Sequence, residues 1–352
     1  MDHSPHWTAG NLLFVLPRGL GDSIVSLLAL QFLAQFRPQG VRLIAAAPSL
    51  YLSFFRALKL PADYWVESDN EAALEEALDD IDIILDCSGC FLSGKDLIQL
   101  AAGGRAFSTY SHSAFMEVGA NMGNFNLTRI DFSEQGLHEI SRVRSPFIDS
   151  YFGEPEPAFY MELRLIYWFL YGLELTDKFH QFKTLVWRID VTAETPLIYD
   201  VCLCPGGSDP LKKWPIDHVK LLVEKLSQKG LRVKVLLGPC EADAADELRR
   251  VHADVIFPED ILQLGLEIER SELVVANDCG PMHVAGALGK PLLAIFGPTN
   301  PVVWFCYNQP SQSYIKGQAS DWREIGVHAT PKVLWPSVDL VLARIESHFA
   351  ST

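Results

Sequence analysis

The stretch "ELVVANDCGPMHVAGALGKPLLAIFG", residues 272–297, decides the fold class. It opens with a short apolar run typical of a buried strand, and it closes with another. Between the two runs, Pro281 suits the first turn of a helix, and the small apolar residues after it continue to Gly289. A strand, a helix and a second strand in this order predict a parallel strand pair joined by a helical crossover.

The same alternation recurs on both sides of residue 190. On the N-terminal side, apolar runs predict strands and amphipathic segments predict helices, in the order 11–16, 19–36, 41–48, 49–58, 64–68, 71–78 and 81–89. On the C-terminal side the corresponding segments before residue 272 are 198–207, 216–230, 231–238, 241–252, 254–257 and 260–270. The sequence therefore predicts an α/β protein with two parallel sheets, each covered by helices on both faces.

Two stretches interrupt this pattern. Residues 105–160 show little periodicity, and we expect a strand, long loops and a helix near 137–149 there. Residues 176–197 form a candidate linker. The predicted divisions are an N-terminal domain at 1–185, a C-terminal domain at 186–330, and a C-terminal segment at 331–352. The last segment contains an amphipathic helix, for which packing back on the N-terminal domain is one alternative.

Composition excludes several classes of protein. Hydrophobic residues make up 49% of the 352 residues, which is enough for two cores. The net charge of -15 and the pI near 5.1 argue against nucleic acid as a partner. Seven scattered cysteines favour reduced thiols, and we expect a cytoplasmic protein without a secretory signal. The apolar run at 163–175 is too short to span a bilayer and suggests a buried helix, with peripheral membrane contact as the alternative.

Ligands of open α/β sheets bind at the carboxyl ends of the strands, and three turns there carry polar residues. The first is "LPRGLGDS", residues 16–23. Asp22 in this turn either caps the following helix or acts as a base toward a bound hydroxyl. Dinucleotide binding is weakly supported, because Ile24 stands where the third glycine of a G-x-G-x-x-G motif would be.

The second turn, "CPGGSDPLKKWP" at 204–215, combines glycines, a serine and two lysines. Turn amides with lysine suit a phosphate or diphosphate, whereas the alternative is a solvated loop anchored by Trp214. After the next strand, Glu241 either caps a helix or accepts hydrogen bonds from ribose hydroxyls. This pattern predicts an anion site rather than a P-loop, because the P-loop spacing is absent.

The third turn, "NDCGPMH" at 277–283, leads into a helix N-terminus, which stabilises anions. His283 alone is typical of packing, but the neighbouring lysines favour a role in ligand binding. The CxxC spacing of Cys87 and Cys90 would suit a thioredoxin-like site, yet no second feature supports one. No cysteine or histidine cluster predicts a zinc site, so we expect no metal, and no G-x-S-x-G motif predicts a serine nucleophile.

Three motifs, in this order, resemble those of family 9 glycosyltransferases, which are the lipopolysaccharide heptosyltransferases and their relatives. They are "GLGDSIVSLLAL", "PGGSDPLKKWP" with "VLLGPCE", and "NDCGPMHVAGALGKPLLAIFGPTNP". The resemblance implies a GT-B fold, in which two Rossmann-like domains face a central cleft. It also implies an inverting, metal-independent transfer of a sugar, typically from ADP-heptose, with no further cofactor. Cys279 stands where serine or threonine is usual in the family, and it has no assigned role.

The resemblance also assigns residues. Asp22 would be the base that deprotonates the acceptor hydroxyl, and Arg18 and Gly21 lie on the acceptor side. Ser208 and Lys212 would hold the donor phosphates, and Glu241 the ribose. The predicted donor-binding set is Gly207, Ser208, Lys212, Glu241, Asp278, Gly280 and His283, of which Asp278 would contact the sugar and Gly280 and His283 the diphosphate.

The expected partners are therefore a nucleotide sugar and a glycan or lipid-linked acceptor of the lipopolysaccharide core or a related glycan, handled in the cytoplasm or at the inner face of the cytoplasmic membrane. Three other functions stay open at this point. They are an inactive nucleotide-sugar-binding protein with this fold, a GT-B type sugar-nucleotide epimerase, and an NAD-linked oxidoreductase.

Overall fold

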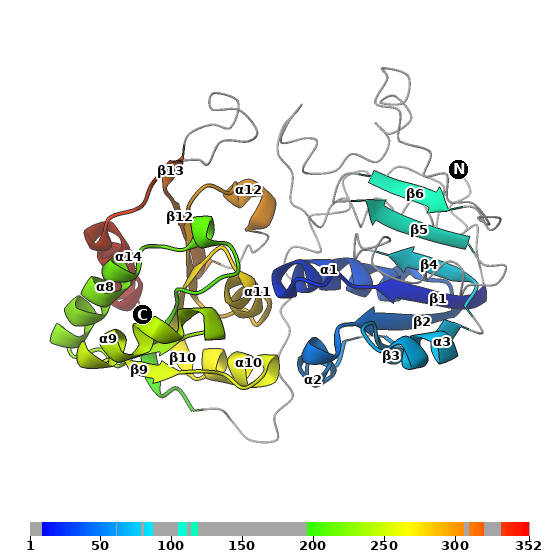
Figure 1. Cartoon of the computed structure of the whole chain (residues 1–352), viewed down its shortest axis with the longest axis horizontal. Helices are drawn as coiled ribbons and strands as arrows, with labels where there is room; N and C mark the ends of the chain where they lie inside the picture. The colour runs from blue at the N-terminus through cyan, green and yellow to red at the C-terminus, as the bar shows by residue number, and fades with distance from the viewer. Residues whose placement is uncertain are drawn as a thin grey trace, which may run out of the picture. The chain divides into compact units, whose positions relative to one another are not determined.

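The computed structural model describes residues 9–60, 62–78, 81–86, 105–110, 114–118, 196–305, 310–319 and 332–351. The chain divides into two compact units, Met1–Lys183 and Thr184–Thr352, close to the predicted boundary at 185/186 (Figure 1). Each unit holds a six-stranded sheet with its own core. The predicted helix near 137–149, the apolar run at 163–175, most of the candidate linker, and Cys87 and Cys90 lie outside the described residues.

The sheet of the first unit has the strand order β3-β2-β1-β4-β5-β6. Its strands are β1 (Ala9–Val15), β2 (Gly40–Ala47), β3 (Tyr64–Glu67), β4 (Ile83–Asp86), β5 (Arg105–Tyr110) and β6 (Ala114–Val118). Its described helices are α1 (Leu20–Phe36), α2 (Ser49–Ala57) and α3 (Glu71–Leu78). All neighbouring strands pair in parallel except β5 and β6, which form an antiparallel pair at one edge.

Alternate residues of the central strands reach the core of this unit. Leu13 of β1 and Ile44 of β2 form one buried cluster with Leu74 of α3. Helix α1 is apolar nearly all round, and ten of its 17 residues are buried. A helix without a polar face must be covered by protein, so α1 is a central element of the unit.

The sheet of the second unit has the order β12-β11-β10-β7-β8-β9, and all its pairings are parallel. Its strands are β7 (Tyr199–Cys204), β8 (Val233–Leu236), β9 (Asp254–Ile256), β10 (Ser271–Asn277), β11 (Leu292–Phe296) and β12 (Gln312–Lys316). Its α-helices are α8 (Ile216–Gln228), α9 (Ala245–Arg250), α10 (Ile261–Glu269), α11 (Gly280–Ala287), α12 (Pro301–Trp304) and α14 (Val338–Ser351). Two 3-10 helices, η2 (Pro210–Lys212) and η3 (Pro239–Ala244), and an antiparallel ribbon of β13 (Gln318–Ala319) and β14 (Val333–Leu334) complete it.

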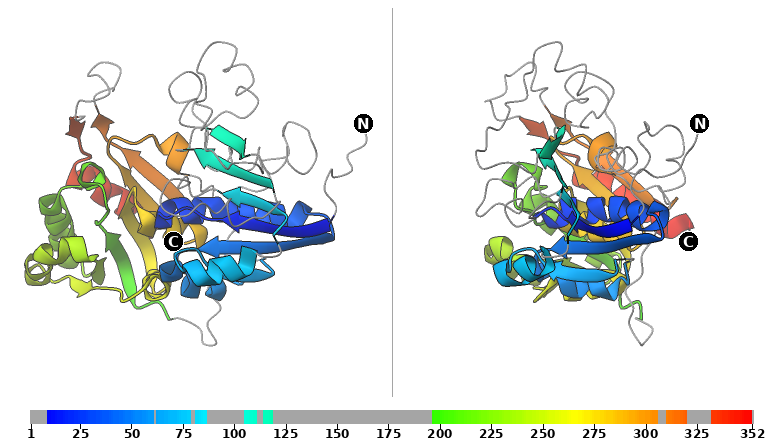
Figure 2. Two further views of the ribbon diagram at one scale, coloured as in Figure 1. Left: turned by 45° about the vertical axis from the view of Figure 1, so that its right-hand side comes forward. Right: turned by 90° about the vertical axis from the view of Figure 1, so that its right-hand side faces the viewer.

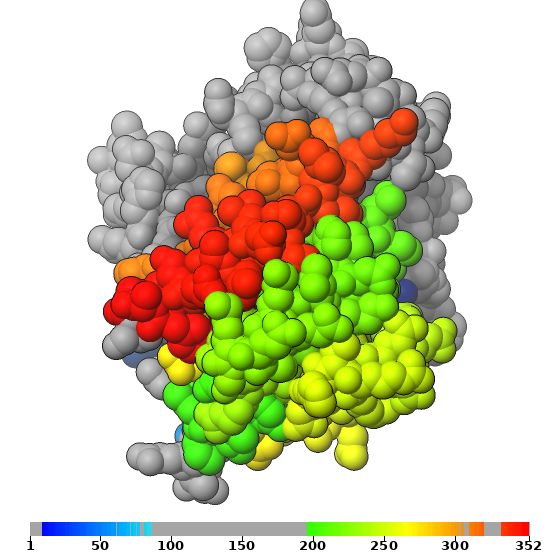
Figure 3. All heavy atoms as spheres, turned by 90° about the vertical axis from the view of Figure 1, so that its left-hand side faces the viewer, coloured from blue at the N-terminus to red at the C-terminus, as the bar shows by residue number. Residues whose placement is uncertain are grey.

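Helices α8, α9 and α14 cover one face of this sheet, and α10 and α11 lie on the other (Figures 1 and 2). Figure 3 shows α14 lying alongside α8 on the outer face of the unit. Val341 and Ile345 of α14 are fully buried in the same core as Leu222 of α8. The C-terminal helix therefore packs on the C-terminal unit, which differs from the packing on the N-terminal domain that the sequence suggested as an alternative. The reason is that its apolar stripe matches the apolar stripe of α8.

The predicted alternation of strands and helices is confirmed in both units, and with it the fold class. Three features differ from the prediction. Strand β6 runs antiparallel, β12 adds an edge strand beyond β11, and the β13–β14 ribbon follows it. In addition, the single helix predicted at 241–252 is split into η3 and α9.

Candidate active site

The polar turns of the second unit gather at one edge of its sheet. Strands β7, β8, β10, β11 and β12 are parallel, so their carboxyl ends, and the turns that follow them, lie at the same edge. The turn after β7 carries Ser208 and Lys212, and that after β8 carries Glu241. Asp278 follows β10, and Lys316 is the last residue of β12.

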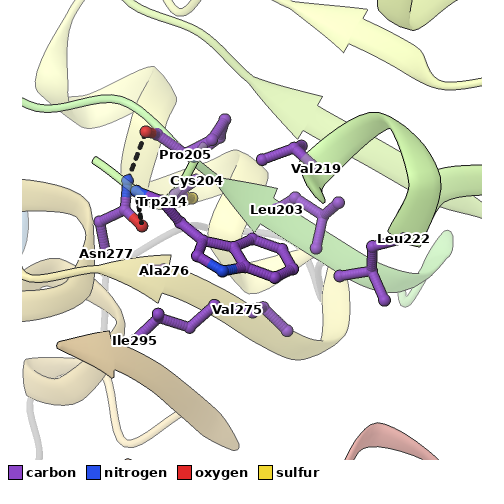
Figure 4. Close-up of a pocket in the computed structure, with 10 residues that line it drawn as sticks. All are labelled: Leu203, Cys204, Pro205, Trp214, Val219, Leu222, Val275, Ala276, Asn277 and Ile295. Atoms are coloured by element: carbon purple, nitrogen blue, oxygen red, sulfur yellow. Dashed lines mark hydrogen bonds between the residues drawn. The ribbon is translucent and has the colours of Figure 1, made fainter. Parts of the chain in front are cut away.

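The turn after β7 is anchored by Trp214, which is 3% exposed. Its indole Nε1 donates to Pro336 O at 3.0 Å, and its backbone N–H donates to Asn277 Oδ1 at 3.2 Å. The amide of Asn277 in turn donates to Pro205 O, which ties both ends of the turn to the end of β10 (Figure 4). Trp214 therefore anchors this turn, as in the alternative interpretation of a solvated loop, and it fixes the base from which the two lysines extend.

A cavity of about 10 Å³ lies against the indole and is lined mainly by apolar side chains, among them Leu203, Val219 and Ile295 (Figure 4). That volume matches at most a single water molecule. It is a packing gap beneath the turn, so the cavity is no part of the ligand site.

Lys212 is paired with Asp278. Its Nζ lies 3.0 Å from Asp278 Oδ2, and Asp278 is only 3% exposed. Thr299, in the turn after β11, donates from its hydroxyl to the same Oδ2 at 2.6 Å. Lys316 adds a second positive charge near this carboxylate: burial lowers the pKa of Lys316, and Asp278 acts in the opposite direction. The buried acid is therefore held by one hydroxyl and balanced by two lysines.

Lys213 is paired with Glu241, whose Oε1 lies 2.5 Å from Lys213 Nζ. The other carboxylate oxygen, Oε2, accepts from Gly238 N at 3.2 Å, so Glu241 closes the first turn of η3 as the sequence suggested. The same oxygen lies 2.8 Å from the position that a Cβ at residue 206 would take. Glycine at 206 is therefore required for the close approach of this carboxylate to the turn after β7.

Helix α11 begins beside these pairs. Cys279 occupies its N-cap position, followed by Gly280 and Pro281 in the first turn. The carbonyl of Cys279 accepts from the backbone N–H groups of Met282 and His283. Burial raises the pKa of the Cys279 thiol to about 12. The Cβ of Cys279 lies 3.5 Å from the place of a Cβ at Gly207, so this thiol packs the start of α11 against the turn after β7.

The structure brings most of the predicted donor-binding residues to this edge. Ser208 is exposed in the turn before η2, Gly207 is half-buried, and His283 is 4% exposed within the first turns of α11. Lys213 was expected only as one of the two lysines of the anion site, and Thr299 and Lys316 had no predicted role. Thr299 lies in the "GPTNP" segment that the resemblance already included, whereas no pattern in the sequence marks Lys316.

The turn after β1 lies in the first unit. Helix α1 has Gly19, not Asp22, at its N-cap, so the predicted capping role of Asp22 is wrong. Asp22 is the third residue of the helix, and its carboxylate folds back over the turn, with Oδ2 2.6 Å from the place of a Cβ at Gly19. Arg18 is exposed and Gly21 half-buried.

Tyr51 of α2 supports this turn, which sequence patterns did not indicate. Its hydroxyl donates to Arg18 O at 2.8 Å. Burial, and then the negative charge of Asp22, raise the pKa of Tyr51, so the phenol stays protonated and keeps this hydrogen bond. The Asp22 turn is therefore braced by a neighbouring helix.

Two features are absent from the part of the chain that the structure describes. No described group of three or more histidine, cysteine, aspartate or glutamate side chains has the arrangement of a metal site. None of the described helices is both long and apolar enough to cross a membrane.

Taken together, the two Rossmann-like units and the lysine–carboxylate pairs at one sheet edge define an α/β protein with a candidate ligand site at the carboxyl ends of its strands. Residues 182–322 match the model of the family described as "Glycosyltransferase family 9 (heptosyltransferase)". The resemblance of the second and third sequence motifs to this family is thus confirmed.

Curated relatives point to the same family. Lipooligosaccharide heptosyltransferase 2 of Haemophilus influenzae is 30% identical over 112 residues, which are 28% of this chain and 31% of the relative. Lipopolysaccharide heptosyltransferase 2 of Escherichia coli K12 is 30% identical over 123 residues, 32% of this chain and 34% of the relative. The chain thus matches about a third of the length of these relatives.

Solved structures extend the likeness of fold to nearly the whole chain. ADP-heptose lipopolysaccharide heptosyltransferase II of E. coli has a TM-score of 0.62 at 16% identity and covers 97% of this chain and 99% of its own. A family 9 glycosyltransferase from Veillonella parvula has a TM-score of 0.67 at 15% identity and covers 99% and 100%. At such identities the likeness establishes the fold, which is that of GT-B heptosyltransferases.

Proposed function

We propose that the protein is an inverting, metal-independent glycosyltransferase that transfers heptose from ADP-heptose to the lipopolysaccharide core or a related glycan. The observation that carries this proposal is the pair of lysine–carboxylate contacts, Lys212–Asp278 and Lys213–Glu241, beside the N-terminus of α11. Relatives named as heptosyltransferases and a similar fold seen in a structure with ADP support the choice of donor.

In the proposed donor complex, the diphosphate binds near Lys212, Ser208 and the start of α11, at Gly280 and His283. The helix N-terminus and the ammonium group both favour a polyanion. Glu241 accepts hydrogen bonds from the ribose hydroxyls, for which Lys213 holds its carboxylate in place. Asp278 accepts from hydroxyls of the sugar.

In the proposed reaction, Asp22 removes the proton from the acceptor hydroxyl while that oxygen bonds to the anomeric carbon of the donor. The bond from the anomeric carbon to the diphosphate oxygen breaks in the same displacement, and ADP leaves with the electron pair. A single displacement inverts the anomeric configuration. Lys212 and the α11 amides stabilise the charge that develops on the leaving diphosphate, which is the role a divalent cation has in other transferases.

The acceptor side is proposed at the Asp22 turn, with Arg18 and Gly21. An exposed arginine suits the anionic groups of a lipid-linked core. The proposed place of action is the inner face of the cytoplasmic membrane, where the acceptor would be reached by peripheral contact.

The test measures transfer from ADP-heptose to a purified heptose-deficient core acceptor, with and without EDTA, for the wild type and Asp22→Asn. We expect EDTA to leave the rate unchanged. We expect the substitution to lower kcat by roughly 10²- to 10⁴-fold, because it removes the base. The affinity for ADP, measured by calorimetry, should be unchanged, since the donor residues lie in the other unit.

Three outcomes would contradict the proposal. Binding of ADP-heptose without transfer to a broad set of acceptors would indicate a binding protein. Release of an epimerised sugar would indicate an epimerase. Full transfer by the Asp22→Asn variant would show that another group is the base.

A further inference from the structure

The turn after β11 brings two side chains to the carboxylate of Asp278. Thr299 donates to Asp278 Oδ2 at 2.6 Å. Asn300 then caps the four-residue helix α12 by accepting from Val302 N at 2.9 Å, and Trp304 ends that helix. The position of Trp304 is therefore set by a capped turn that Thr299 ties to the site.

Asp278 retains an oxygen for a ligand. The two contacts of its carboxylate, from Lys212 and Thr299, are both made to Oδ2. Among the described residues, none donates a hydrogen bond to Oδ1. Both oxygens of a buried carboxylate ordinarily accept hydrogen bonds, and Asp278 is only 3% exposed. Its Oδ1, at the edge of the sheet, is therefore suited to accept a hydrogen bond from a ligand.

Lys212, which pairs with Asp278, also lies near the ring of Trp304. The Lys212 Nζ is 5.7 Å from the centre of the indole, which is near the outer limit of a cation–π contact. The lysine thus approaches the ring without packing tightly on it. The side chain of Trp304 is half-buried.

A carboxylate and an aromatic ring, both near the Nζ of Lys212, match the two surfaces of a sugar. The hydroxyls of a sugar need acceptors, and its C–H groups form an apolar face that packs on an aromatic ring. A site whose buried polar atoms bond a substrate hydroxyl also rejects analogues without that hydroxyl.

We propose that Trp304 and Thr299 determine specificity for the donor sugar. Trp304 packs against the apolar face of the sugar, and Thr299 holds Asp278 so that Oδ1 accepts from a sugar hydroxyl. This inference rests on the proposed function, because it takes the ligand at Asp278 to be the sugar of a nucleotide diphosphate. The contrasting explanation is that the ring only positions Lys212 for the diphosphate and does not touch the sugar.

Calorimetric titration of the full chain with ADP and with ADP-heptose separates the two explanations. For Trp304→Leu we expect binding of ADP-heptose to weaken by roughly tenfold while that of ADP stays within about twofold. Trp304→Phe should restore part of the loss, because it retains a ring. Thr299→Val should also weaken ADP-heptose selectively, and Lys212→Met should weaken both ligands.

Controls address folding and the meaning of each result. Leu340→Ala, an exposed apolar residue of α14, should leave both affinities unchanged, and all variants should keep the unfolding midpoint of the wild type. An equal loss of ADP and ADP-heptose binding by Trp304→Leu overturns the inference in favour of lysine positioning. Unchanged binding of both ligands overturns it as well. A wild type that binds neither ligand overturns the proposed function itself, which is a distinguishable result.

Discussion

Cys279 shows how burial decides the chemistry of a single residue. Burial raises the pKa of its thiol to about 12, so the proton stays on at mildly alkaline pH. At pH 8 the reactive thiolate is then roughly one part in ten thousand. We expect iodoacetamide to alkylate Cys279 far more slowly than Cys240, which is exposed. Peptide mass spectrometry of the native protein over time measures both rates, and equal rates would contradict this account of Cys279.

Gly297, at the end of β11, is a second position where one residue type is required. A Cβ there would lie 2.3 Å from the ring of Trp335. We expect Gly297→Ala to lower the free energy of unfolding by about 1–3 kcal/mol, because a rigid ring must move. Gly207→Ala is the matched control for stability, since its Cβ would meet only Cys279 at an ordinary 3.5 Å. Urea unfolding compares the two variants, and equal midpoints would show that the Trp335 ring can move without a cost in stability.

The sequence predicted which residues of the site are chemically suitable, but not which of them pair. Lys212 and Asp278 are far apart in the chain and meet because β7 and β10 are neighbours in the sheet. Strand order is a property of the tertiary structure, so no local pattern could give the Lys212–Asp278 pair. For the same reason Lys316, on an edge strand that was not predicted, was absent from the expected site.

At the scale of elements, packing rather than surface charge should hold α14 in place. Ile345 is fully buried against the α8 core, and we expect Ile345→Ala to cost about 2–5 kcal/mol. Lys229 pairs with Glu346 at 2.6 Å between the same helices, but both side chains are nearly half exposed. Lys229→Ala should therefore cost about 1 kcal/mol or less. Chemical unfolding followed by circular dichroism measures both, and a larger loss for the lysine variant would contradict this order.

Strands β2 and β3 are linked by an acid whose contribution depends on pH. Hydrogen bonding from Arg37, and then from the backbone N–H of Leu43, holds the pKa of Asp63 below its usual range. A lowered pKa in the folded state stabilises the protein above the unfolded-state pKa near 3.9, and this stabilisation is lost as the pH falls through the lowered value.

We therefore expect Asp63→Asn to be less stable than the wild type at neutral pH. The difference should shrink as the pH falls below about 4, because the wild-type carboxyl then gains its proton. Urea midpoints of both proteins across this range provide the measurement. A difference that does not depend on pH would show that the side chain acts through packing.

Elements with a strong apolar period were predictable, and those set by edge pairing were not. Residues 12–15 of β1, 273–276 of β10 and all of β11 are buried and apolar, which is typical of strands covered on both faces. Three of the five residues of β12 are exposed, and two of these are adjacent, which gives no clear period. The direction of β6 follows from its short connection to β5, since only an antiparallel pair can be joined so closely.

For the whole molecule, fold similarity reaches much further than sequence similarity. The family model matches residues 182–322, whereas the solved E. coli heptosyltransferase II covers 97% of the chain at 16% identity. An apolar pattern with the right period can specify a fold without shared residues. The predicted donor-binding residues lie within the matched range 182–322, while Arg18, Gly21 and Asp22 lie outside it and depend on the first sequence motif and its place at a strand end.

This difference leads to a prediction for the whole chain. ADP should stabilise the second unit, because that unit carries the lysine–carboxylate pairs. The gain in the free energy of unfolding grows with the ratio of free ADP to its Kd, and it is about 2.7 kcal/mol when that ratio is about a hundred. Thermal unfolding of the full chain should then show a transition that moves with ADP.

Ile345→Ala should lower the midpoint of that same transition, because Ile345 belongs to the core of the second unit. Leu27→Ala, a fully buried change in α1, is the matched variant for the first unit and should lower a transition that ADP shifts less. If both transitions coincide and respond equally to ADP, the two units unfold together. If ADP shifts only the transition that Leu27→Ala lowers, the nucleotide binds in the first unit, which would contradict the proposed donor site.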